Sequence, residues 1–198
     1  SPARLLEVTR YFTLFDKKAG KIVARYQQVF GIKRLIERIN TRSVTGGREG
    51  GVIWHTTGSG KSFTMVFLSK ALILHESLKQ CRIVVVTDRV DLETQLSKTF
   101  ASGGELAGKK DKEAAMATSG KRLAEQIGKG TERIIFSLIQ KFNTATKMPE
   151  CVNKSSDIIV LIDEGHRSQG GENHVRMKLA LPNAAFVAFT GTPLLKED

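Results

Sequence analysis

Five short apolar segments, each bounded by turn-forming residues, constrain the fold of this 198-residue chain more than any other feature. They cover residues 51–54, 82–87, 133–136, 158–162 and 185–189. The segments are too uniformly apolar for a sheet with one exposed face, and they are typical of central strands in a parallel sheet. Between them, residues 62–78, 90–100, 121–127 and 175–180 are predicted to be helical. The alternation predicts a doubly wound α/β domain with a mostly parallel sheet.

The regions outside this alternation carry weaker signals. Residues 22–39 repeat apolar side chains with a helical period and predict an amphipathic helix. We expect residues 1–21 to be a connecting segment and residues 22–198 to form one domain, with an exposed insertion at about 102–121 that is rich in Gly, Ala and Lys. The abrupt ends of the chain suggest a fragment of a longer protein.

The charge balance favours a polyanionic partner, because 31 Lys and Arg oppose 20 Asp and Glu and give a net charge of +11. Charge alone does not distinguish DNA, RNA and simple solubility. No apolar run approaches the roughly 18 residues that cross a bilayer, and no secretory signal is visible. Cys81 and Cys151 form no C-x-x-C pair, so we expect free thiols, no structural zinc and a cytoplasmic protein.

The stretch IWHTTGSGKSF, residues 53–63, joins the first predicted strand to the next helix. It differs from the phosphate-loop pattern G-x-x-x-x-G-K-[ST] at one position, where His55 replaces glycine. A phosphate loop leaves a buried strand and enters a helix, because backbone N–H groups and the helix N-terminus bind the anion together. The residues expected to bind nucleotide here are Thr57, Gly58, Ser59, Gly60, Lys61 and Ser62. The alternative is a Gly/Ser turn that contains GKS by chance.

A second signal comes from IIVLIDEGHRSQ, residues 158–169, where an apolar run ends in two carboxylates. Asp163 at a strand end would join Ser62 in holding Mg²⁺, and Glu164 would orient or deprotonate the attacking water. Lys61 can reach the β- and γ-phosphates, so these groups together provide the positioning and charge neutralisation that phosphoanhydride hydrolysis needs. Taken alone, the pattern also fits a strand followed by a solvated acidic turn.

The pair TTGSGKS and DEGH resembles motifs I and II of superfamily 2 helicases and translocases. More specifically, four runs resemble the motor subunit of type I restriction-modification enzymes, over about residues 22–195: GVIWHTTGSGKSFTMVFLSK, VVVTDRVDLETQL, LIDEGHRSQGG and FVAFTGTPLL. The resemblance implies a P-loop NTPase domain of the RecA-like helicase type, the first of two motor lobes, with ATP and Mg²⁺ as cofactors. Gly165 departs from the alanine that is common in this family.

The resemblance also implies roles for residues away from the phosphate loop. Arg25 and Gln28, in RYQQ, match an element whose glutamine recognises the adenine edge, although the pair could simply lie on the outer face of the helix. Thr190 and Thr192, in TGTP, match the motif that couples the ATP site to the nucleic-acid site. We expect His166 to bridge motifs II and III, the alternative being a histidine with only a local hydrogen bond.

Strand-end elements of the family suggest where DNA is contacted. In TDRVDLETQ the candidates are Thr87 and Arg89, which could bind phosphates through a hydroxyl and a guanidinium. A salt-bridged helix start capped by Asp88 or Asp91 is an equal alternative. In IIFSLIQKF the weaker candidates are Ser137, Gln140 and Lys141.

The implied function is ATP-dependent translocation of duplex DNA before endonucleolytic cleavage, with the motor following the phosphate backbone without reading sequence. The implied partners are double-stranded DNA, the methylation and specificity subunits, and a second motor lobe and a nuclease domain of the same full-length chain. Two alternatives stay open: another superfamily 2 helicase or remodeller, which the HRSQGG continuation disfavours, and a nucleotide-gated scaffold without turnover. We expect the fragment alone to bind ATP weakly, hydrolyse it very slowly and cut no DNA.

Overall fold

Five parallel strands form the central sheet of the computed structural model, which describes residues 1–16, 20–44, 46–56, 58–102, 113–163 and 172–191. The strands lie in the order β3-β7-β6-β4-β5. Their bounds are β3 (Gly51–Trp54), β4 (Arg82–Thr87), β5 (Ile134–Leu138), β6 (Ile158–Asp163) and β7 (Ala185–Thr190). Each adjacent pair is parallel. The predicted fold class is therefore confirmed.

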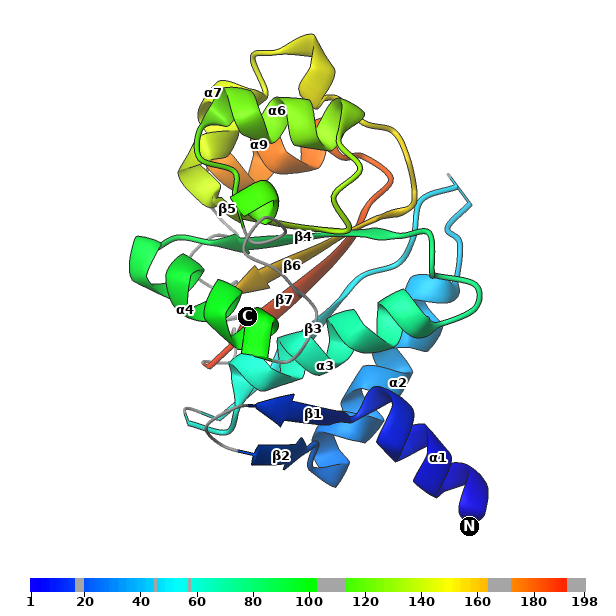
Figure 1. Cartoon of the computed structure of the whole chain (residues 1–198). Coiled ribbons are helices and arrows are strands. Elements are labelled where there is room, and N and C mark those ends of the chain that lie inside the picture. Colours follow the sequence, from blue (N-terminus) through cyan, green and yellow to red (C-terminus); the bar gives the residue numbers. More distant parts are fainter. Residues whose placement is uncertain (17–19, 45, 57, 103–112, 164–171, 192–198) are drawn as a thin grey trace, which may run out of the picture.

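Helices cover both faces of this sheet (Figure 1). One face carries α2 (Tyr26–Asn40), α3 (Lys61–Leu74) and α4 (Val90–Ser102). The other carries α6 (Gly120–Lys129), α7 (Phe142–Ala145) and α9 (Glu172–Ala180), with the short turns η1 (Ile139–Lys141) and η2 (Pro149–Cys151). Successive residues of β4 alternate between the two cores: Val85 packs with the first and Val86 with the second. This two-sided burial explains why the strand sequences are uniformly apolar.

β3 was predicted to be a central strand but lies at one edge of the sheet. No strand lies beyond β3 among the described residues, and on one face of this strand Val52 and Trp54 are 59% and 64% exposed. The opposite face of β3 is covered, since a Cβ on Gly51 would lie 3.1 Å from the Leu35 side chain of α2. β3 thus presents one free face and one free edge.

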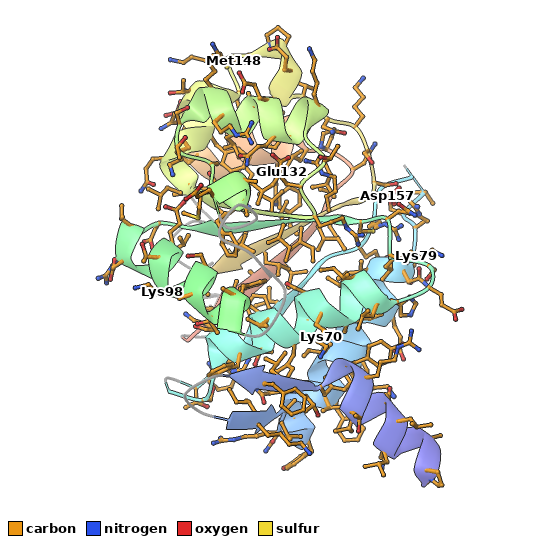
Figure 2. The ribbon with its side chains drawn as sticks, viewed as in Figure 1. Lys70, Lys79, Lys98, Glu132, Met148 and Asp157 are labelled. Carbon is orange, nitrogen blue, oxygen red and sulfur yellow. The ribbon has the colours of Figure 1, made fainter. Side chains whose placement is uncertain are left out.

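The N-terminal residues form structure that the sequence did not predict. α1 (Pro2–Tyr11) leads into an antiparallel hairpin of β1 (Thr13–Asp16) and β2 (Gly20–Val23). The helix predicted over 22–39 therefore begins at Tyr26, and Ile22 belongs to the hairpin, paired with Leu14. Leu14 is buried in the same cluster as α3, and Lys70 of α3 donates to the Thr13 carbonyl at 2.7 Å (Figure 2).

The segment expected to be an exposed insertion is partly buried. Residues 103–112 lie outside the described ranges, but Ala115 and Ala117 are 2% and 0% exposed. The Ala117 N–H donates to the Phe136 carbonyl at 2.9 Å, which attaches this segment to β5. Small alanine side chains fit this site, so a shortage of large apolar residues did not indicate exposure here.

Arg48 anchors the polar loop that precedes β3. Its side chain is only 4% exposed and donates to Asp157 Oδ1 at 2.8 Å, to the Ser156 carbonyl at 2.7 Å and to the Ile39 carbonyl at 3.1 Å. These bonds join the end of α2 to the loop before β6, where Asp157 is labelled in Figure 2. The backbone of Gly50 packs directly against β7: a Cβ at this position would lie 2.0 Å from the Phe186 carbonyl oxygen. The start of β3 is therefore tightly fixed.

Candidate nucleotide site

The loop between β3 and α3 has the backbone geometry of an anion-binding turn. Gly58 and Gly60 have φ angles of +77° and +92°, in the left-handed region that glycine adopts without strain. The Ser59 N–H donates to the Thr56 carbonyl at 3.0 Å, and α3 begins directly after Gly60. The first turn of α3 contains no acidic side chain, so its positive end is not neutralised from within. This loop can bind a phosphate group.

Lys61 and Asp163 meet in space although they are far apart in sequence. Lys61 is the first residue of α3 and Asp163 the last residue of β6, and their Nζ and Oδ1 atoms lie 2.9 Å apart. The Asp163 side chain is 3% exposed. Asp163 Oδ1 has no partner of hydrogen-bond geometry in the described structure, so we interpret the contact as an ion pair alone. A carboxylate oxygen such as that of Asp163, together with a hydroxyl oxygen such as that of Ser62 in the first turn of α3, is a donor set that suits Mg²⁺.

The strand order explains this meeting. β7 lies between β3 and β6, and its residue Phe189 is in register with both Ile53 and Asp163. All three strands are parallel, so their carboxyl ends reach the same edge of the sheet, where ligands of such sheets bind.

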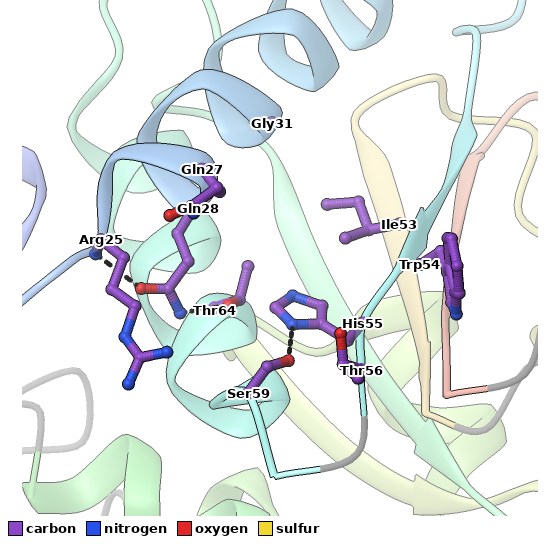
Figure 3. A pocket seen from close by; sticks show the side chains of 10 residues that line it. All are labelled: Arg25, Gln27, Gln28, Gly31, Ile53, Trp54, His55, Thr56, Ser59 and Thr64. Atoms are coloured by element: carbon purple, nitrogen blue, oxygen red, sulfur yellow. Dashed lines mark hydrogen bonds between the residues drawn. The ribbon is translucent and has the colours of Figure 1, made fainter.

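A cavity of about 340 Å³ lies beside the loop (Figure 3). Its lining comes from the start of α2, the end of β3, the loop and α3: Arg25, Gln27, Gln28, Gly31, Ile53, Trp54, His55, Thr56, Ser59 and Thr64. Arg25 and Gln28, the two residues expected to contact adenine, are therefore next to the phosphate loop.

Gln28 is engaged by protein groups at both ends of its amide. Its Oε1 accepts from the Arg25 N–H at 2.8 Å, and its Nε2 donates to Thr64 Oγ1 at 2.7 Å and weakly to the Gly60 carbonyl at 3.5 Å (Figure 3). These bonds fasten the start of α2 to α3. Both amide hydrogens are occupied, and one Oε1 lone pair is left for a ligand.

His55 is a site residue that the sequence reasoning did not assign. Its Nδ1 lies 2.8 Å from Ser59 Oγ (Figure 3). Its ring stacks on Phe189 with 6.5 Å between centroids. Burial, and secondarily the nearby charge of Lys61, lower the pKa of His55, which favours the neutral ring. The signal that could have identified it is its place in the position where the phosphate-loop pattern has glycine.

Several expected site residues lie outside the described ranges, namely Thr57, Glu164, His166 and Thr192. Thr190 is described and is 3% exposed at the end of β7, where its carbonyl accepts from the His55 N–H at 2.8 Å. Trp54 adds a second link to this strand end, because its Nε1 donates to the Gly191 carbonyl at 3.2 Å. The start of the TGTP motif is thus bonded to the end of β3.

Two of the expected DNA contacts are buried. Thr87 and Ser137 are 2% and 0% exposed, and Ser137 Oγ donates to the neighbouring Leu138 carbonyl at 3.0 Å. Contrary to expectation, the structure presents neither hydroxyl at the surface.

The charged DNA candidates are paired within the protein. Arg89 contacts both carboxylate oxygens of Asp91, at 3.1 and 2.8 Å, which is the salt-bridged helix start considered as the alternative. Lys141 Nζ lies 3.2 Å from Glu93 Oε1, and both side chains are mostly buried. Gln140 is exposed and donates to a backbone carbonyl at 3.0 Å. Of the five candidates, Arg89 and Gln140 are the two exposed to solvent.

A strand–loop–helix unit with a lysine at the helix start, opposed by an acidic residue from a parallel strand, defines a P-loop NTPase domain. The chain belongs to the SWI2/SNF2 ATPase family, whose model matches residues 27–198. Within the described ranges, no helix has both the length and the apolar content to cross a membrane.

The curated relatives are endonuclease subunits of type I restriction enzymes. The HindI endonuclease subunit of Haemophilus influenzae is 38% identical over 218 residues, which cover 100% of this chain and 20% of that protein. The putative MjaIXP endonuclease subunit of Methanocaldococcus jannaschii is 36% identical over 201 residues, covering 98% of this chain and 18% of the relative. The chain therefore spans about a fifth of these relatives.

Solved structures support the fold. The Sulfolobus solfataricus SWI2/SNF2 ATPase core in complex with dsDNA superposes with a TM-score of 0.61 and 14% identity, covering 87% of this chain and 33% of that one. The UvsW helicase from bacteriophage T4 has a TM-score of 0.62 at 14% identity, covering 97% and 60%. At such identities the likeness concerns the fold alone.

Proposed function

We propose that this chain is the first motor lobe of a type I restriction enzyme endonuclease subunit, and that ATP hydrolysis in the full-length protein drives translocation of duplex DNA before cleavage. The observation that carries the proposal is the 2.9 Å contact between Lys61 and Asp163 at the N-terminus of α3. The identity of 38% to the HindI subunit favours this reading over another superfamily 2 motor.

In this proposal the loop binds the ATP phosphates through backbone N–H groups and Lys61, and Ser62 and Asp163 hold Mg²⁺. The metal, when bound, would neutralise phosphate charge. Lys61 would exchange its contact with Asp163 for the β- and γ-phosphates, which needs only a short movement of a flexible side chain. Glu164 would orient the attacking water, and His166, Thr190 and Thr192 would relay the nucleotide state to the DNA site.

The remaining partners are those that the resemblance to type I restriction enzymes implies. A second motor lobe and a nuclease domain would lie in the rest of the full-length chain, and methylation and specificity subunits would supply sequence recognition. Exposed Arg89 and Gln140 are the DNA contacts that the structure favours among the five candidates. Two free, buried thiols, Cys81 and Cys151, are compatible with work in the cytoplasm.

The test uses the full-length protein with its partner subunits and duplex DNA. Lys61→Ala should reduce DNA-stimulated ATP hydrolysis and translocation by about 100-fold or more, because it removes a charge that stabilises the transferred phosphoryl group. Lys79→Ala is the matched control, since Lys79 is an exposed lysine beyond the other end of α3. Normal translocation by the Lys61 variant would refute the proposed function. The isolated chain should hydrolyse ATP very slowly in the same assay.

A further inference from the structure

His55 contacts two elements that meet at the nucleotide site. Through its side chain it reaches the loop, with Nδ1 2.8 Å from Ser59 Oγ. Through its ring and its backbone it reaches β7, by stacking on Phe189 and by donating its N–H to Thr190 at 2.8 Å. The residue is 9% exposed, so the position of its ring is defined by neighbouring groups rather than by solvent.

The contact with Ser59 adds a side-chain restraint to a glycine-rich loop. Gly58 and Gly60 flank Ser59, and glycine loses more conformational freedom on ordering than any other residue. A hydrogen bond to a neighbouring, well-packed ring therefore lowers the cost of holding this loop in one shape. Either tautomer of the neutral ring makes the bond: Nδ1–H donates to the hydroxyl oxygen, or Nδ1 accepts the hydroxyl hydrogen.

We propose that His55 is a positioning residue for the phosphate loop. Packed against the end of β7, His55 holds Ser59 in place through the contact of Nδ1 with Oγ and thereby sets the affinity for ATP. The inference rests on the proposed function, since it concerns the same nucleotide site. It gives a use to the residue that replaces the glycine of the general pattern: the loop is fixed by a side-chain bond at a point where glycine would leave it free.

Two substitutions separate the hydrogen bond from the ring contact. In His55→Asn, an amide atom branches from Cγ as Nδ1 does, so the bond to Ser59 can form while the ring that packs on Phe189 is lost. In His55→Phe the ring is kept and the hydrogen-bonding atom is lost. Ser59→Ala removes the other partner, and His75→Asn, in a half-buried histidine just beyond the far end of α3, is the control.

The experiment measures KM for ATP and kcat of DNA-stimulated hydrolysis in the full-length protein, with thermal melting of each variant. We expect His55→Phe and Ser59→Ala each to raise KM about three- to tenfold, the loss of one net hydrogen bond, with kcat largely kept. The double variant should have a KM no higher than that of the more impaired single variant, because both substitutions remove the same hydrogen bond. His55→Asn should stay within about twofold of the wild type.

Three outcomes would overturn the inference: a wild-type KM for His55→Phe, additive effects in the double variant, or a His55→Asn protein as impaired as His55→Phe. The last would show that ring packing alone matters. Lys61→Ala is measured in parallel. Loss of activity in that variant together with a wild-type His55→Phe protein would reject the positioning role alone, whereas an active Lys61→Ala protein would reject the proposed function.

Discussion

Gln28 can be tested for two roles that predict different results. The family resemblance assigns its amide to the adenine edge, whereas the structure bonds it to Arg25, Thr64 and Gly60. Gln28→Ala removes two short hydrogen bonds, of 2.8 and 2.7 Å, and one at the distance limit of 3.5 Å. A net hydrogen bond is worth about 0.5–1.5 kcal/mol, and the bond to Arg25 is exposed, so we expect a loss of about 1–2 kcal/mol.

Urea unfolding of the isolated chain would measure this loss, with an unchanged dependence on denaturant. A thermal midpoint lower by about 2–8 °C would correspond to it for a domain of this size. Gln27→Ala is the matched control, since Gln27 lines the same cavity from the next position.

Nucleotide binding then separates the two roles. If Gln28 mainly fastens α2 to the loop, Gln28→Ala lowers the affinities for ATP and for GTP by the same factor. A variant of unchanged stability that loses affinity for ATP alone would refute this reasoning and establish adenine recognition instead.

Three further predictions concern stability and reactivity. Arg48→Ala should lower the free energy of unfolding by about 2–4 kcal/mol in urea titrations, because it removes three hydrogen bonds of a buried guanidinium. The loss is reduced because the ion-pair partner Asp157 is half exposed, and Arg48→Lys should lose about half as much. Burial raises the pKa of Cys151 to about 11, so at pH 8 a thiol reagent should label it slowly in the native protein and rapidly in urea, and equal rates would contradict its burial. Burial also lowers the pKa of His174, with a smaller effect of Lys178. The unfolded state therefore binds a proton at His174 more readily than the folded state does. The contribution of neutral His174 to the free energy of unfolding is complete above the ordinary pKa of 6.5 and should be lost as the pH falls below it. In urea titrations, His174→Gln should lose less stability over the same fall in pH.

The sequence predicted those features that depend on local pattern. The strands were found because residues on both faces of the sheet are buried, such as Leu161 on one face and Val84 on the other. The loop at 55–62 was found because glycine spacing, lysine and a following helix occur together. Asp163 was placed next to Lys61 because parallel strands end at one edge of a sheet.

The predictions that failed concern features that depend on contacts between residues distant in the sequence. Lys141 pairs with Glu93 across 48 positions, so its charge is neutralised by a residue that no local pattern connects to it. The two strands of the hairpin at 13–23 have four residues each, too few for alternation to outweigh the helical period that starts nearby. Whether Gln28 bonds to protein or ligand depends on the approach of α3, which sequence spacing does not define.

The exposed face of β3 has a practical consequence for handling the isolated lobe. A free strand edge beside Val52 and Trp54 is a template for pairing with a second molecule, so the protein should self-associate as its concentration rises. A lysine in place of Val52 would act as a gatekeeper, because its charge would sit on the free face while the buried face of the strand is unchanged. The strand that leads into the phosphate loop is thus also a site at which the isolated lobe is open to aggregation.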